Sequence, residues 1–449
     1  MKNSTILSTL SLSFALSLSA VSQASDRQTG IAEVLRDEAL LSNHAWQLVE
    51  SLTTEVGPRL AGTDSDHRAV AWAKKKLESL EFDKVWLEPV TFPIWQRSHE
   101  SARIISPYPQ PLHITALGYS ASTKGELSGE IIAFPTLAEL EAASEDTIKG
   151  KIVFIDEATQ RTKDGSGYGK TVIMRYKGAT LTKEKGGLAV LIRSVGTDSH
   201  RLPHTGVGVL LDDPIPAAAL SSPDADQLRR ILARGEAVTV GIDTKVSLQA
   251  EGSSWNVIAQ LDGKDTPEEI VLIGAHLDSW DLGTGAIDDG AGVAITTAVA
   301  AQIAGFTERP QRSIRLVLFA NEEQGLWGAK SYAKDHETEL AQHVWASESD
   351  FGAGLIHHFD ANNEQLASRA EPVLAALDIT VGHEPGSGGP DIGPLSEQGV
   401  TTFRLRQNGM DYFDVHHTAD DTLDKIEPNN LKQNVAAWVV ATWLAANPD

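Results

Sequence analysis

Residues 271–292 read VLIGAHLDSWDLGTGAIDDGAG. The apolar run at the start predicts a short buried strand, and the stretch 290–305 that follows has the composition of a helix. Between them, His276 stands at the end of the strand, and Asp288 and Asp289 close a glycine-rich loop. Ligands of open α/β sheets collect at the carboxyl ends of the strands, so imidazole and carboxylate groups placed there indicate a metal site.

Three further apolar runs lead into groups of the same kind. They are residues 313–319 before Glu322 and Glu323, residues 344–347 before Asp350, and residues 401–405 before the loop with His416 and His417. Residues 256–263 and 271–276 suggest two adjacent strands. Strands that alternate with helices predict an α/β fold, with a mostly parallel, mixed sheet covered by helices on both faces.

The chain of 449 residues is long enough for two or three domains. Residues 118–251 differ from the rest, because short strand-like runs alternate there with glycines and charged turns. We interpret them as a small α/β domain inserted into a larger one, which leaves residues 25–117 and 252–449 as the two parts of the catalytic domain. His200 and His204 in the insertion are isolated in the sequence, and we expect them at the surface.

The N-terminus has the features of a signal peptide over residues 1–24. Lys2 gives a positive start, residues 6–21 are apolar and serine-rich, and Ser22-Gln23-Ala24 offers small residues for cleavage. We therefore expect an exported protein, periplasmic or secreted, that has no membrane segment after cleavage. The chain has no cysteine, and its formal charge of −23 argues against nucleic acid and anionic membrane surfaces as partners.

The groups at the strand ends carry the chemistry jointly. A lone histidine or aspartate at such a place is more often structural, and Asp288-Asp289 could simply cap a helix. Two imidazoles with three or more carboxylates, however, suit zinc or another late first-row metal in a paired site. Asp278 stands two residues after His276, where a carboxylate can hold the second ring nitrogen of a ligand.

Taken together, the motifs resemble the co-catalytic dizinc exopeptidases, the family of the bacterial zinc aminopeptidases and glutamate carboxypeptidase. The matching pieces, in the family's order, are GPRLAGT (57–63), AHLDS (275–279), GAIDDGAG (285–292), NEEQGLWGA (321–329), ESDFG (348–352) and HHTADDT (416–422). The last two are most similar to the carboxypeptidase Q (plasma glutamate carboxypeptidase) branch. In the insertion, GKIVFID (150–156) and GGLAVLIRS (186–194) resemble a protease-associated domain.

The resemblance implies two zinc ions per chain and a role for each residue that matches a motif. Asp288 would bridge the ions, and the peptide bond after it would be cis. The remaining implied roles are His276 and Asp350 on one metal, Glu323 and His417 on the other, Glu322 as general base and Asp278 orienting His276. The resemblance also implies a homodimer.

The implied reaction is hydrolysis of dipeptides or short peptides with a free N-terminus, by a water shared between the metals and activated by Glu322. An acidic cluster repels a substrate carboxylate, so recognition of that end needs other groups. The candidates are Arg404, Arg406, Asn408, Tyr412 and Ser387. Two alternatives are a binding protein on the same fold and a single-zinc acyltransferase that resembles glutaminyl cyclase.

Overall fold

The computed structural model describes residues 27–448, so the predicted signal peptide lies outside the described residues. Among the residues described, no helix is long and apolar enough to cross a membrane. The strands are β1 (Lys84–Ser106), β2 (Gln110–Leu112), β3 (Ile114–Ala116), β4 (Leu127–Phe134), β5 (Ile152–Ile155), β6 (Ala189–Arg193), β7 (Ala217–Leu220), β8 (Thr239–Leu261), β9 (Thr266–His276), β10 (Arg312–Phe319), β11 (His343–Glu348), β12 (Ile356–Ala361), β13 (Thr380–Gly382) and β14 (Phe403–Gln407).

A first helix covers residues 27–41. The other helices are α2 (His44–Glu55), α3 (Asp64–Glu78), α4 (Leu137–Ala142), α5 (Glu145–Ile148), α6 (Ser166–Thr171), α7 (Ile173–Glu184), α8 (Ser222–Leu232), α9 (Ala291–Ala304), α10 (Trp327–Asp335), α11 (Glu364–Ala375), α12 (Gly393–Ser396), α13 (Tyr412–Val415) and α14 (Pro428–Ala446). Three short helical turns are η1 (Ala286–Gly290), η2 (Glu337–Gln342) and η3 (Leu423–Lys425).

The main sheet is mixed and mostly parallel, as predicted. Its strand order is β11-β9-β10-β8-β4-β5-β6-β7-β3, and β1 pairs with β8. β11, β9 and β10 are parallel, as are β4 to β7, whereas β8 is antiparallel to its three partners β10, β4 and β1.

Strand β9 shows why the sheet has helices on both faces. Successive side chains of a strand point to opposite faces. Val271 and Ile273 pack in a core with α2, α9 and α14, while Leu272 packs in a second core with α10 and α12. An uninterrupted apolar run is what a strand buried on both faces needs.

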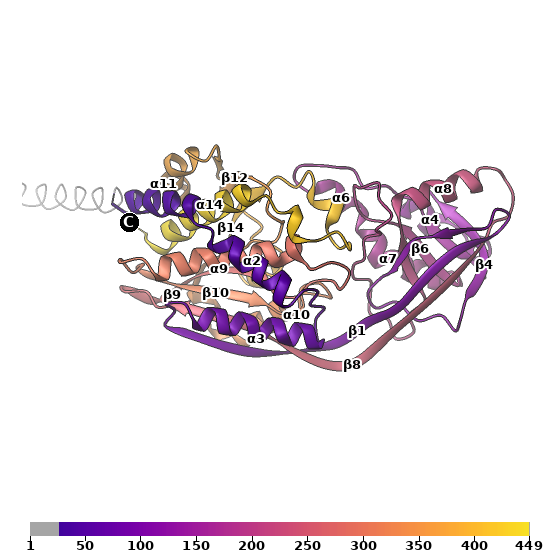
Figure 1. The fold of residues 1–449 in the computed structure, drawn as a ribbon, viewed down its shortest axis with the longest axis horizontal. Coiled ribbons are helices and arrows are strands. Elements are labelled where there is room, and N and C mark those ends of the chain that lie inside the picture. Colours follow the sequence, from indigo (N-terminus) through magenta and orange to yellow (C-terminus); the bar gives the residue numbers. More distant parts are fainter. Residues whose placement is uncertain (1–26, 449) are drawn as a thin grey trace, which may run out of the picture.

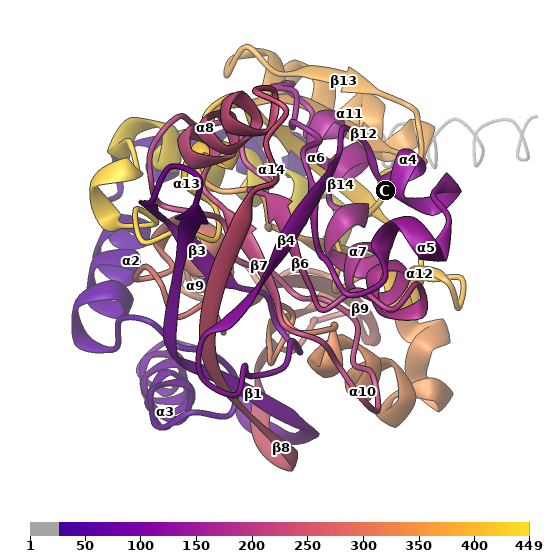
Figure 2. The same ribbon diagram turned by 90° about the vertical axis from the view of Figure 1, so that its right-hand side faces the viewer.

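Two long strands join the two ends of the molecule. β1 and β8 pair along almost their whole length, and Figure 1 shows them running together from the sheet of β9 and β10 to the end that holds β4 and α8. At that end, α8 covers one face of β5 and β6, and α4 with α7 covers the other (Figure 2). The first of these two cores contains residues between Ala102 and Ile242. The predicted domain limits at residues 118 and 251 stay a prediction.

One expectation about the strands was wrong, and one predicted strand has shifted bounds and lies outside the main sheet. β8 and β9 are not adjacent, because α9 returns the chain so that β10 lies between them. The run predicted over residues 401–405 is β14, residues 403–407, and it belongs to a separate sheet with the order β13-β12-β14. An isolated bridge between Ala346 and Thr402, the residue before β14, and a hydrogen bond of 2.8 Å from Ser347 Oγ to the carbonyl oxygen of Phe403 link this strand to β11 of the main sheet.

A candidate metal centre at the ends of the strands

Asp288 stands at the middle of a buried cluster of imidazoles and carboxylates. It lies in η1, where the backbone leaves helical geometry, and the peptide bond between Asp288 and Asp289 is cis, which confirms that prediction. Asp288 Oδ1 lies 3.1 Å from His276 Nε2, and Asp288 Oδ2 lies 3.0 Å from His417 Nε2. Each oxygen of one carboxylate therefore faces a different imidazole.

On one side of Asp288, His276 ends strand β9. Its Nε2 atom lies 3.7 Å from Asp350 Oδ1, so His276, Asp288 and Asp350 form a group that could hold one cation. Its Nδ1 atom lies 3.0 Å from the carbonyl oxygen of Asp278 and 3.6 Å from that residue's Oδ1. The same Oδ1 accepts a hydrogen bond of 3.0 Å from the backbone N–H of Glu322, so Asp278 links His276 to the predicted base.

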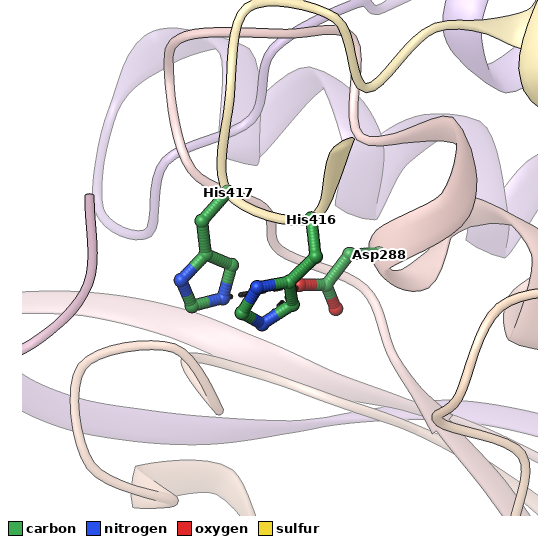
Figure 3. A group of neighbouring side chains, drawn as sticks. All are labelled: Asp288, His416 and His417. Atoms are coloured by element: carbon green, nitrogen blue, oxygen red, sulfur yellow. Dashed lines mark ion pairs between the residues drawn. The ribbon is translucent and has the colours of Figure 1, made fainter. Parts of the chain in front are cut away.

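On the other side, His417 Nε2 lies 2.9 Å from Glu323 Oε2. His417 Nδ1 lies 3.1 Å from the carbonyl oxygen of Thr205, and donation to that oxygen leaves Nε2 free to bind a cation. His416 stacks on His417 with ring centroids 3.5 Å apart, and its Nε2 lies 3.5 Å from Asp288 Oδ2. Figure 3 shows both rings directed at Asp288, so the structure brings together both histidines, not only the one selected from sequence.

The donor set fits metal cations. Asp288 Oδ2 contacts His417 without hydrogen-bond geometry, and Glu323 Oε1, also buried, has no hydrogen-bond partner in the described part of the chain. Among the described residues, no lysine or arginine forms an ion pair with Asp288, Glu322, Glu323 or Asp350. Buried carboxylates without a counter-ion are costly, and bound cations would supply the missing charge.

The pKa values show the same imbalance of charge. Burial, together with the nearby carboxylates of Asp350 and Glu323, holds the pKa of Glu322 well above its ordinary value. Burial alone would lower the pKa of His276, but its contacts with Asp278, Asp288 and Asp350 outweigh burial and raise that pKa well above the ordinary value. The site therefore favours added positive charge, as a metal site does.

Two residues that the sequence reasoning did not select hold this loop in place. The side chain of Asp421 accepts the backbone N–H groups of Ile287 at 2.6 Å and of Asp288 at 3.2 Å. Arg59 donates to the carbonyl oxygens of Leu277, Thr284 and Gly285 at 2.6, 2.8 and 2.8 Å, respectively. The motifs HHTADDT and GPRLAGT contain them, which is the signal that could have identified both.

A cavity of about 720 Å³ opens onto the cluster, lined by Glu322, Glu323, Asp350 and His417. Of the predicted substrate-binding residues, Arg404, Ser387 and Tyr412 also line it, and Arg404 Nη1 donates to Ser387 Oγ at 2.9 Å. Arg406 and Asn408 are not in its lining. The Arg406 side chain pairs with Asp360, and the Asn408 side chain accepts the backbone N–H of Met410.

The region predicted as an insertion supplies another wall of the cavity. Tyr168, Val172, Arg175 and Tyr176 line it from α6, α7 and the residue between them. The expectation that His204 lies at the surface was wrong. His204 is fully buried, contacts Asp198 at 2.6 Å and lies with its ring 6.4 Å from that of His416. It is buried because this region folds back onto the loop that carries the paired histidines.

Known proteins share both the sequence and the fold. The sequence model that describes peptidase family M28 matches residues 256–442 of this chain. Carboxypeptidase Q of Xenopus laevis is 33% identical over 412 residues, which are 90% of this chain and 86% of that protein. The crystal structure of a peptidase M28 precursor from Shewanella amazonensis has a TM-score of 0.91 and 48% identity, and covers 94% of this chain and 98% of its own. A zinc aminopeptidase from Bacillus subtilis shares the fold, with a TM-score of 0.66, 20% identity and coverage of 90% and 95%.

The fold and the donor set define a zinc metallopeptidase. Because carboxypeptidase Q and the peptidase M28 precursor match 90% and 94% of this chain, at 33% and 48% identity, the protein belongs to peptidase family M28.

Proposed function

We propose that the protein is a dizinc exopeptidase that hydrolyses dipeptides or short peptides with a free N-terminus. The observation that carries the proposal is the position of Asp288, whose two oxygens face His276 and His417 separately. One carboxylate shared by two imidazole groups supports a pair of ions. The names of the relatives, carboxypeptidase Q and zinc aminopeptidase, support an exopeptidase.

The residues that would hold the ions are His276, Asp350, Glu323 and His417, with Asp288 shared between the two. When bound, the zinc ions supply Lewis acidity, which lowers the pKa of water and polarises a peptide carbonyl.

The chain's own residues then move the proton and position the substrate. The Glu322 carboxylate takes a proton from the attacking water and passes it to the leaving amine, a role worth roughly 10²- to 10⁴-fold in rate. Asp278 positions both Glu322, through its backbone N–H, and His276. The acidic side chains of the cavity can hold the free ammonium group of a peptide. Arg404, Ser387 and Tyr412 remain our proposed contacts for the rest of the substrate.

Substitution of Glu322 tests the base. The variant Glu322→Gln removes the proton acceptor and keeps the size of the side chain, so it should retain zinc and lose most turnover of dipeptides. Elemental analysis and a ninhydrin assay of released amino acids measure the two quantities. Near-normal turnover would contradict the proposed role of Glu322.

Zinc content and activity together distinguish the exopeptidase from the acyltransferase and from the binding protein. Two zinc ions per chain with hydrolysis support the exopeptidase, whereas one ion with cyclisation of N-terminal glutamine would indicate an acyltransferase. Binding of peptides without turnover would indicate a binding protein.

We further propose that the protein is exported after cleavage behind Ala24, that residues 118–251 form a protease-associated-like domain, and that the chain dimerises. N-terminal sequencing of the mature protein, limited proteolysis and light scattering, respectively, test these three proposals.

A further inference from the structure

Arg175 is a buried arginine on α7 that lines the cavity above the candidate metal centre. Only 2% of its surface is exposed. Its Nη1 atom donates to the hydroxyl of Tyr168 at 3.0 Å, and its guanidinium lies 5.5 Å from the centre of the same ring. Its Nε and Nη2 atoms, in contrast, are buried and have no hydrogen-bond partner among residues 27–448.

Other buried arginines of this protein show what a purely structural arginine looks like. Arg59 donates from Nε, Nη1 and Nη2 to three backbone carbonyl oxygens. Arg193 pairs with Asp156 and Asp226, and Arg315 donates to Gln260 and Tyr332. Arg175 differs, because among the described residues it forms no ion pair and one edge of its guanidinium has no acceptor.

The neighbouring histidine does not satisfy Arg175 either. His417 Nδ1 lies 3.4 Å from Arg175 Nη1, but this nitrogen also lies 3.1 Å from the carbonyl oxygen of Thr205. If Nδ1 carries the proton that it donates to Thr205, it cannot accept another from the arginine. The fold nevertheless makes room for the guanidinium, since a Cβ atom on Gly206 would lie 2.1 Å from Arg175 Nη1.

A buried guanidinium without an ion-pair partner costs free energy, and an anion that enters the cavity would relieve this cost. Nε and Nη2 lie on one edge of the guanidinium, and their N–H groups are parallel donors that match the two oxygens of a carboxylate. The anion that a peptidase meets in its substrate is a carboxylate. The carboxylates of the candidate metal centre repel such a group, so its binding requires a cation on another wall.

We propose that Arg175 is a specificity-determining residue that binds the C-terminal carboxylate of the substrate through Nε and Nη2. The guanidinium adjoins His417, a candidate metal ligand, so the carboxylate would lie close to the reacting bond. Since one residue spans about 3.8 Å between Cα atoms, this position suits a single residue after the bond that is cleaved. The preferred substrates are then dipeptides, or peptides that release one C-terminal residue. The inference rests on the proposed peptidase function.

The test compares a dipeptide with its C-terminal amide in the zinc-loaded enzyme. Wild-type kcat/KM should be higher for the free acid. The variant Arg175→Gln should lose about 10- to 100-fold in kcat/KM for the acid, mainly through KM, because a hydrogen-bonded charge pair is lost. The amide should change by less than about 3-fold, and Arg175→Lys should recover part of the loss for the acid, since it restores the charge without the fork.

Two variants serve as comparisons. Arg229→Gln removes an exposed arginine of α8 and should leave kcat/KM unchanged for both the acid and the amide. Arg404→Gln tests the rival cation of the cavity. The proposal is overturned if Arg175→Gln lowers kcat/KM equally for the acid and the amide. It is also overturned if Arg404→Gln abolishes the preference for the acid and Arg175→Gln does not.

Binding measurements keep the inference separate from the proposed function. In a Glu322→Gln background, calorimetry gives Kd for L-alanyl-L-alanine and for its amide, whether or not the protein turns peptides over. Addition of Arg175→Gln should weaken binding of the acid by about 10- to 100-fold and leave that of the amide unchanged. If the Kd of the acid is the same with and without Arg175→Gln, the proposed role of Arg175 is overturned. Absence of turnover by the wild type would contradict only the proposed function. Zinc content and Tm of each variant verify that the fold is intact.

Discussion

Replacement of His343 by glutamine should make the protein less sensitive to acid. His343 begins β11 and is 3% exposed. Its Nδ1 atom lies 3.1 Å from the carbonyl oxygen of Glu339, and its Nε2 atom lies 2.8 Å from the hydroxyl of Tyr332. Because Arg315 donates to that hydroxyl at 2.9 Å, the hydroxyl proton is directed at Nε2, and the neutral ring satisfies both nitrogens.

Protonation of this ring is unfavourable for several reasons. Burial lowers the pKa of His343 to about 4 from 6.5, and the positive charges of Arg315 and His336 act in the same direction, whereas the carbonyl and the carboxylate of Glu339 oppose them. A histidine whose folded pKa is lowered stabilises the fold fully above its unfolded pKa, and this stabilisation is lost as the pH falls from 6.5 towards 4.

The size of the effect follows from the two pKa values. One pKa unit corresponds to about 1.4 kcal/mol, so the full difference is about 3 kcal/mol, of which about 2 kcal/mol is already lost between pH 8 and pH 5. Urea unfolding at both pH values measures it. The variant His343→Gln should lose about 2 kcal/mol less than wild type between them. Zinc lost at low pH affects both proteins and cancels in this comparison.

A control variant and a refuting result complete the test. His99→Gln replaces an exposed histidine on β1 and should keep the full wild-type loss. Equal losses for wild type and His343→Gln would refute the reasoning, because the neutral ring would then contribute nothing to the dependence on pH.

Two further predictions concern the metal centre. Asp421→Asn leaves one acceptor where two backbone N–H groups bind, at Ile287 and Asp288, so we expect zinc affinity to fall by roughly 10- to 100-fold in chelator competition, with the fold retained. An unchanged affinity would contradict a positioning role for Asp421. Removal of zinc with a chelator should abolish peptidase activity. It should also lower Tm, because a free zinc concentration a thousand times Kd stabilises a fold by about 4 kcal/mol for each bound ion. Added zinc should restore both properties, and a Tm that does not respond would show that the ions do not stabilise the fold.

The local sequence determined which segments form buried strands and which polar residues follow them. The apolar run of β9 predicted a strand buried on both faces, because a side chain's environment in such a strand repeats every two residues. The short motifs predicted which groups stand at strand ends, and the cis peptide bond after Asp288 was expected from the resemblance alone. His276, Asp288, Glu323, Asp350 and His417 lie together as the motifs suggested, although their roles as ligands remain proposals.

Tertiary structure decided what depends on segments far apart in the chain. The sequence cannot show that β10 lies between β8 and β9, or that residues 403–407 join a second sheet, because many apolar runs of similar hydrophobicity can pair equally well. For the same reason, burial of His204 became visible only once the region predicted as an insertion lay against the loop of His416 and His417. Arg175 is the clearest case: its sequence context is an ordinary helix, and only packing shows that its Nε and Nη2 atoms are buried without a hydrogen-bond partner among the described residues.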